Sequence, residues 1–133
     1  MAIRVKVLVL LAAALLLVGC AATSIPEFDA PQTERDMLPA DAVLSDIDPG
    51  STRYVGDVEG AEVYLARADG DQLCVIQLRG GQPEQMGCGA GMGIGTTLPS
   101  GTMIEAGSFR FPADQVEDAT REQVSPSVTI VTP

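Results

Sequence analysis

The sequence predicts a mainly β protein: a small antiparallel β-sheet or sandwich-like domain with one disulfide, preceded by a signal peptide and a disordered tether. Three observations favour this fold. Short β-rich runs separated by turn residues fill the chain after residue 50. Two cysteines lie where one hairpin would place them opposite each other. The segment before residue 50 is rich in proline and acidic residues. We therefore expect a signal peptide at 1–19, a tether at 20–50 and a β domain at 51–133.

The first 19 residues have the composition of a signal peptide. Arg4 and Lys6 provide a positive start, and residues 7–18 are all Val, Leu or Ala. This run is too short to cross a hydrocarbon core, which needs about 20 apolar residues. A plain secretory signal would end in an Ala-x-Ala-like site, and Ala21-Ala22-Thr23 fits that pattern poorly.

Leu17-Val18-Gly19-Cys20 instead resembles the lipobox of bacterial lipoproteins, and the resemblance covers about the first 20 residues. It implies that Leu17, Val18 and Gly19 form the recognition signal, that the chain is cut before Cys20, and that the Cys20 thiol carries a diacylglyceryl group. Two acyl chains, at about 0.8 kcal/mol per buried CH₂, would hold the protein almost permanently on the membrane. The expected location is the outer side of the bacterial cell membrane. The alternative is an ordinary buried or free cysteine.

Residues 20–50 contain four prolines and seven acidic residues, which predicts an extended, solvated tether. A flexible chain of this length would span on the order of 30 Å. Within it, residues 39–47 predict one short helix, because Pro39 suits the first helical position and Val43, Leu44 and Ile47 form an apolar stripe.

The β domain is predicted from seven short runs and the turn residues between them. Short connections imply antiparallel hairpins, and residues 112–122 are the one part of the domain where a helical turn is expected. The predicted strands are 53–58, 61–67, 73–78, 84–89, 102–106, 109–111 and 127–131.

The cysteines fit a hairpin centred on Gly81, since residues 74 and 88 are equally distant from it. Directly opposite residues have Cβ atoms about 4.5–5.5 Å apart, close to what a disulfide needs. If Cys20 carries lipid, Cys74 and Cys88 remain as one pair, which suits an oxidising compartment. The alternative is two buried free thiols.

Glycine occurs at every second position from 87 to 95. A period of two is the strand period, so these glycines could form one smooth face that Tyr54 or Tyr64 covers. The other hypotheses are a mobile loop or a binding surface. A phosphate-binding loop is excluded, because neither G-x-G-x-x-G nor G-x-x-x-x-G-K-[ST] occurs.

Composition excludes several activities. The chain has 18 acidic and 8 basic residues, and loss of Arg4 and Lys6 with the signal would leave 18 acidic against 6 basic, about −12. Such a chain should not bind nucleic acid and would be repelled by an anionic membrane. Histidine is absent and Lys6 is the only lysine, which removes His-dependent triads, Ser–Lys dyads and Schiff bases. We therefore expect no enzyme, no cofactor and no metal site.

The segments DPGSTRYVGDVEGAEVYLA, QLCVIQL and EQMGCG, and the use of arginine in place of lysine, are similar to small exported lipoproteins of high-GC Gram-positive bacteria. That resemblance spans about 80 residues and brings no known site. Two functions remain open: a module that binds another envelope protein or has a structural role there, and a module that binds a soluble ligand or a cation.

Overall fold

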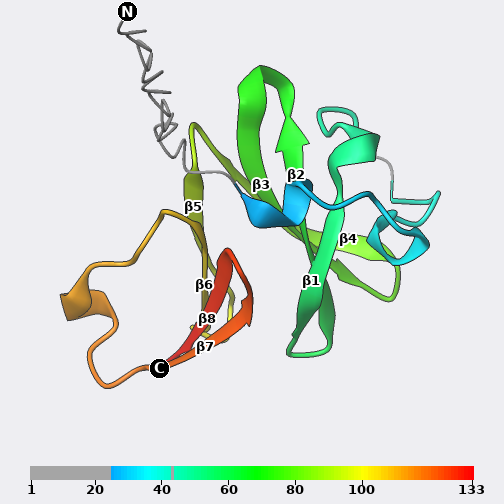
Figure 1. Ribbon diagram of the computed structural model, residues 1–133. Helices are drawn as coiled ribbons and strands as arrows, with labels where there is room; N and C mark the ends of the chain where they lie inside the picture. Colours follow the sequence, from blue (N-terminus) through cyan, green and yellow to red (C-terminus); the bar gives the residue numbers. More distant parts are fainter. Residues whose placement is uncertain (1–24, 43) are drawn as a thin grey trace, which may run out of the picture.

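The computed structural model describes residues 25–42 and 44–133, and it contains two four-stranded antiparallel sheets (Figure 1). Sheet A has the order β1-β2-β3-β4, and sheet B has the order β5-β6-β8-β7. The strands are β1 (Arg53–Val58), β2 (Ala61–Ala68), β3 (Gln72–Arg79), β4 (Gln82–Gly89), β5 (Gly93–Thr97), β6 (Met103–Gly107), β7 (Thr120–Ser125) and β8 (Val128–Thr132).

Helical structure in the described part of the chain is limited to five short 3₁₀ segments. These are η1 (Pro26–Phe28), η2 (Glu34–Asp36), η3 (Pro49–Ser51), η4 (Asp69–Asp71) and η5 (Ala113–Gln115). The mainly β fold class predicted from the sequence is therefore confirmed.

The two sheets pack face to face around one apolar core. Sheet A contributes Val63, Leu65, Leu73 and Val75 to it, and sheet B contributes residues of β6 and β8 such as Ile104 and Val128. The fully buried members of this cluster explain why the sheets form a sandwich, since burial of apolar side chains is the main favourable term in folding.

Sheet A is apolar on its outer face as well. Tyr64, Ala66, Cys74, Ile76 and Leu78 point away from sheet B and form a second buried cluster. A strand that is buried on both faces has an almost continuous apolar sequence rather than an alternating one, and residues 73–78 of β3 are all buried.

The segment before β1 covers this outer face, which corrects the prediction of a solvated tether up to residue 50. Ala42 and Ile47 are at most 6% exposed within the outer cluster, and Ile47 forms a β-bridge with Ala68. Ile25, 4% exposed, packs instead into the core between the sheets. The physical reason is that the outer face of sheet A would otherwise expose a large apolar surface. Residues 20–24 of the predicted tether lie outside the described residues.

The short helix predicted at 39–47 is also wrong. Two separate turns take its place: the Ala42 amide donates to the Pro39 carbonyl at 2.9 Å, and the Ile47 amide donates to the Leu44 carbonyl at 3.2 Å. Leu44 and Ile47 of the predicted apolar stripe pack in the outer cluster of sheet A, because contact with the sheet outweighs the propensity of a short isolated helix. Val43, the third member of the stripe, lies outside the described residues.

The hairpin β3–β4 confirms the predicted disulfide. Gly80 and Gly81 both have positive φ, as a two-residue type I′ turn requires. This turn is centred between residues 80 and 81, and a register shift after Gln77 then brings Cys74 opposite Cys88. The two sulfur atoms are bonded, and Cys74 is fully buried while Cys88 is exposed.

The glycine run forms the end of β4, a turn and the start of β5, so it connects the two sheets. Gly93 and Gly95 lie under Phe109: a Cβ atom on Gly95 would stand 2.1 Å from Cε1 of that ring. The hypothesis of one packed glycine strand is therefore wrong for the whole run, because a turn that contains Gly91 divides it. It holds for Gly93 and Gly95, but their cover is Phe109 and neither tyrosine. Tyr54 and Tyr64 instead pack edge to face with each other in the outer cluster of sheet A.

The C-terminal third contains the remaining differences. Residues 109–111 are irregular, because Phe109 lies across sheet B rather than within it. Residues 120–125, for which we predicted no strand, form β7. Their polar sequence, TREQVS, did not predict a strand, because this strand is largely exposed at the edge of sheet B.

We expect Gly95→Ala to destabilise the domain by about 1–3 kcal/mol, because the added methyl group overlaps the Phe109 ring. Urea denaturation would measure the loss. Gly50→Ala is the matched control, since its Cβ would have 3.5 Å to its nearest neighbour. In a Phe109→Ala background the Gly95→Ala change should cost much less, and equal costs in both backgrounds would contradict the assigned contact.

Candidate functional site

The segment that covers sheet A is fixed to β1 by a network centred on Asp36. One carboxylate oxygen of Asp36 accepts from the Tyr54 amide at 3.0 Å, and the other accepts from the Thr33 amide at 2.9 Å and the Thr33 hydroxyl at 3.0 Å. The buried Thr52 hydroxyl donates to the Asp36 carbonyl at 2.7 Å. These bonds determine where the chain crosses the sheet.

Arg35 adds a second attachment. Its guanidinium lies 3.8 Å from the centre of the Tyr54 ring and forms an ion pair with Glu62 at 3.2 Å. The Tyr64 hydroxyl also donates to Glu62, at 3.0 Å. Burial first, and then this bond to a carboxylate, raise the pKa of Tyr64 to about 12.

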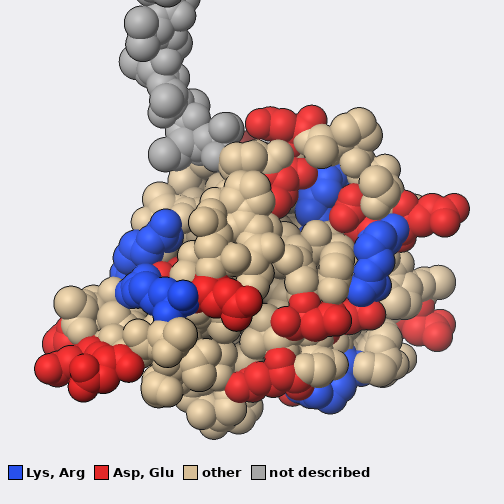
Figure 2. Space-filling model, turned by 60° about the horizontal axis from the view of Figure 1, so that its bottom comes forward, with Lys and Arg blue, Asp and Glu red and all other residues tan. Residues whose placement is uncertain are grey.

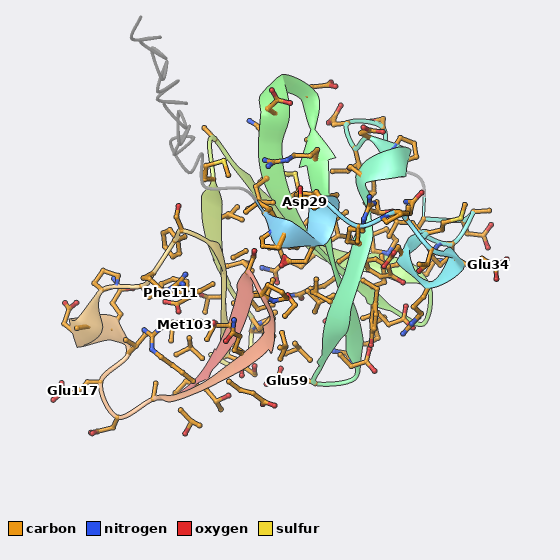
Figure 3. All side chains as sticks on the ribbon, viewed as in Figure 1. Asp29, Glu34, Glu59, Met103, Phe111 and Glu117 are labelled. Carbon is orange, nitrogen blue, oxygen red and sulfur yellow. A yellow bond between two sulfur atoms is a disulfide. The ribbon has the colours of Figure 1, made fainter. Side chains whose placement is uncertain are left out.

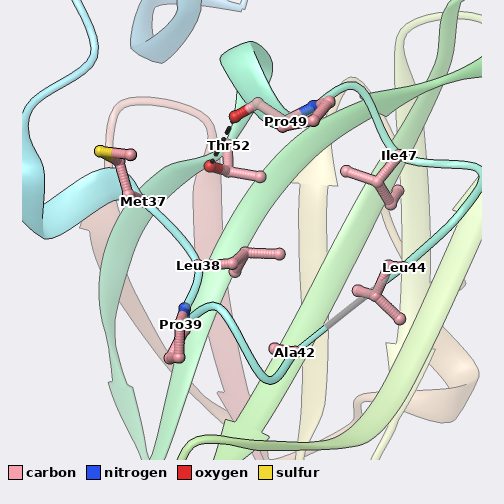
Figure 4. Close-up of a pocket in the computed structure, with 8 residues that line it drawn as sticks. All are labelled: Met37, Leu38, Pro39, Ala42, Leu44, Ile47, Pro49 and Thr52. Atoms are coloured by element: carbon pink, nitrogen blue, oxygen red, sulfur yellow. Dashed lines mark hydrogen bonds between the residues drawn. The ribbon is translucent and has the colours of Figure 1, made fainter.

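Between these attachments and the bridge at Ile47, the segment encloses an apolar groove (Figure 4). Its volume is about 250 Å³, and no charged side chain lines it. Met37 stands at the groove with 57% of its surface exposed, whereas Thr52 is fully buried. The lining residues are Met37, Leu38, Pro39, Ala42, Leu44, Ile47, Pro49 and Thr52.

The size and chemistry of the groove limit what it can hold. Pockets for drug-sized ligands have about 300–1,000 Å³, so this groove suits one or two apolar side chains or a small apolar molecule. An uncharged lining gives a cation nothing to bind. Sequence reasoning missed this site because it placed the lining residues in a solvated tether, although Leu38, Leu44 and Ile47 are the signal that could have revealed it.

The buried carboxylate of Glu105 has a structural role. One of its oxygens pairs with Arg121, and the other accepts from the Phe111 amide at 2.7 Å. The bond from the Phe111 amide holds the loop 108–119 on sheet B, where Figure 3 places Phe111, and the pair with Arg121 joins β6 to β7.

Glu59, at the tip of the β1–β2 hairpin (Figure 3), connects the sheets at one end. It accepts from the Thr102 hydroxyl at 2.7 Å and the Ser100 hydroxyl at 2.8 Å, and these two bonds lower the pKa of its carboxyl group.

Acidic side chains elsewhere are spread among arginines over the face in Figure 2. Among residues 25–42 and 44–133, no three Asp, Glu or Cys side chains gather closely enough to hold a metal ion.

The residues predicted from the sequence as sites fall into two groups. Cys74 and Cys88 are brought together in the disulfide. Leu17, Val18, Gly19 and the lipidation candidate Cys20 lie outside the described residues. Within the described ranges, no helix is long and apolar enough to span a bilayer.

Comparisons of this chain with protein-family models, curated proteins and solved structures gave no match.

The Asp36 network predicts a pH-dependent stability. Burial favours the neutral acid, but the bonds from the Thr33 and Tyr54 amides outweigh it and hold the pKa of Asp36 below its usual value. A lowered folded-state pKa stabilises the protein above the unfolded pKa of about 3.9, and this contribution is lost as the pH falls through the lower folded-state value.

We expect Asp36→Asn to destabilise the protein at pH 7 and to have progressively less effect as the pH falls below the unfolded pKa of about 3.9 and through the lower folded-state pKa, where Asp36 of the folded protein itself becomes protonated. Urea denaturation across this pH range measures the difference. Asp41→Asn, at an exposed position of the same segment, controls for the loss of one negative charge. A wild-type-minus-Asn difference that stays constant down to pH 2 would show that the carboxylate does not stabilise the segment.

Proposed function

We propose that this chain is a bacterial lipoprotein, anchored by a diacylglyceryl group on Cys20, whose β domain acts outside the cytoplasm as a non-catalytic module that binds another envelope protein or supports the envelope. The observation that carries the proposal is the LVGC motif directly after a charged and apolar leader. The distribution of the cysteines supports it. Cys74 and Cys88 are consumed in a disulfide, which suits an exported domain, and Cys20 remains as the odd thiol.

Two observations favour binding over catalysis. Without histidine, and with its one lysine in the leader, the chain lacks the imidazole bases and amine nucleophiles that many enzymes use. The most buried carboxylate, Glu105, has both oxygens occupied by the fold.

The apolar groove is the proposed contact point. A volume of about 250 Å³ matches inserted side chains of a partner, and apolar anchors that fill small pockets dominate the affinity of many interfaces. The same uncharged lining favours a small apolar molecule over a cation as the second candidate. A melting temperature that rises with one apolar compound, without any protein partner, would favour that alternative.

The proposed anchor predicts the intact mass of the mature protein. The wild-type protein extracted from its native membrane without reductant should begin at Cys20, carry one diacylglyceryl group and lack two hydrogens because of the disulfide. Cys20→Ser should lose the lipid mass and leave the membrane fraction on carbonate washing, because the thiol carries the acyl chains in the family that the motif resembles. Ala22→Ser is the control. Wild-type protein that starts after Ala22 without lipid would refute the anchor.

The groove predicts a position-specific crosslink in intact cells. A photoreactive amino acid at Met37 should give one discrete crosslinked species, and the same amino acid at Met86 should not. Met86 is the matched control because, in the ranges that the structure describes, it is the other exposed large apolar residue, 41% exposed and outside the groove. Leu38→Asp should abolish the Met37 crosslink by placing a charge in the groove. Identical crosslinks from both positions would contradict a specific contact.

A further inference from the structure

We infer that one end of the β-sandwich lies directly against the lipid headgroups. This end consists of Met92 in the β4–β5 turn, Gly107 at the end of β6 with Ser108 after it, and Pro126 and Ser127 in the β7–β8 turn. This inference rests on the proposed anchor at Cys20. The partner of this surface is a phospholipid bilayer.

The first argument is the length of chain between the anchor and the fold. Ile25 is 4% exposed and packs into the core between the sheets, so the folded domain includes Ile25 and does not start at residue 51. Only four residues, 21–24, separate Ile25 from Cys20. Five residue steps reach at most about 18 Å when fully extended. A tether of about 30 residues would have let the domain move on the order of 30 Å away.

The second argument is where the chain enters the fold. Ile25 and Pro26 lie in a shallow depression that they share with Met92, Ser108 and Pro126 and their neighbours. The Glu27 carboxylate accepts from the Ser127 amide at 2.9 Å, which fixes η1 to the β7–β8 turn. Because the headgroup layer of one leaflet occupies about 5–8 Å, an anchor within 18 Å keeps these turns at the membrane surface.

The third argument is charge. About 12 negative charges in excess on the mature chain would be repelled by an anionic membrane. The depression around Ile25 has no charged lining residue. A cation lies beside it, since Arg110 donates to the Gly107 carbonyl at 2.9 Å. The lining of this depression therefore brings no charge of its own against anionic lipid, and the Glu27 carboxylate beside it accepts from the Ser127 amide.

Acidic groups at the same end of sheet A set the orientation. Phe28 of η1 lies under Arg67 near the end of β2, at 4.9 Å, and the exposed Asp69 and Asp71 follow directly in η4. Repulsion of these two carboxylates tilts sheet A away from the bilayer, so the turns of sheet B face it.

The opposite end of the sandwich then faces away from the membrane. Strand β8 runs from the Pro126–Ser127 turn to Thr132, a distance of about 15 Å at 3.3 Å per residue. Figure 1 shows the C-terminus on the side of the molecule away from η1.

The experiment compares two labelled variants of the full lipidated protein. Ser108→Cys and Thr132→Cys are both exposed positions, and each introduces the one free thiol of a mature chain whose other cysteines are acylated or paired. A nitrobenzoxadiazole fluorophore is attached to each, and the protein is reconstituted in vesicles of phosphatidylcholine with a minority of phosphatidylglycerol and headgroup spin-labelled lipid.

Quenching of the label at residue 108 should be several-fold stronger than at residue 132. A Gly/Ser insertion of about 30 residues between Ser24 and Ile25 should reduce the quenching at 108 to the level at 132, since it restores a long tether. Equal quenching at both positions, or quenching at 108 that persists after the insertion, would overturn the inference.

Intact mass separates this failure from failure of the proposed function. A protein that carries the diacylglyceryl group but shows equal quenching keeps its anchor and loses the assigned orientation. A protein without the lipid mass loses the proposed anchor itself, and with it the basis of the inference.

Discussion

The fold depends on the β2–β3 hairpin, which is buried on both of its faces. Its inner face forms the core with sheet B, and its outer face contributes the larger part of the second apolar cluster. Burial of one Leu or Ile side chain stabilises a fold by about 1.5–3 kcal/mol relative to leaving it exposed. Two strands with this property cannot serve as the outer layer of a two-layer sandwich. The domain therefore needs a further layer, and the chain supplies it from the segment before β1, which ends in a bridge from Ile47 to Ala68.

The outer face of sheet B is also covered by a further layer, which a different part of the chain supplies. Its outer face carries the buried Glu105 and the glycines Gly93 and Gly95, and the loop 108–119 closes over them through Phe109 and the bond from the Phe111 amide. Each sheet is thus covered by an irregular segment, and a carboxylate that accepts a hydrogen bond from a backbone amide holds each segment in place. This carboxylate is Asp36 on sheet A and Glu105 on sheet B. Carboxylates suit this role because each can accept several hydrogen bonds, and bonds to a charged acceptor are stronger than neutral ones.

The sequence allowed prediction of the parts that depend on local pattern, such as the strand class, the β3–β4 hairpin and its disulfide, because turn glycines and opposed cysteines act over short range. The covering segments could not be predicted in the same way. Pro39, Asp41 and Pro49 are typical of solvated linkers, and only contact with Ile76 and Leu78 makes their apolar neighbours part of the core. The strand β7 was missed because four of its six residues are exposed and polar. The groove could not be predicted from the sequence either, because its walls come from a segment without regular structure whose position depends on tertiary contacts.

The same covering segment connects stability, binding and position on the membrane. It closes the outer cluster of sheet A, lines the groove, and leaves only four residues before the proposed anchor. A partner that inserted a side chain beside Met37 would therefore contact the layer that holds sheet A closed, and binding would tighten that layer against β1 and β2. With the proposed anchor in place, the domain could not move far from the bilayer, so such a partner would have to meet the groove close to the membrane. Envelope proteins with an apolar side chain presented close to the membrane surface satisfy this geometry.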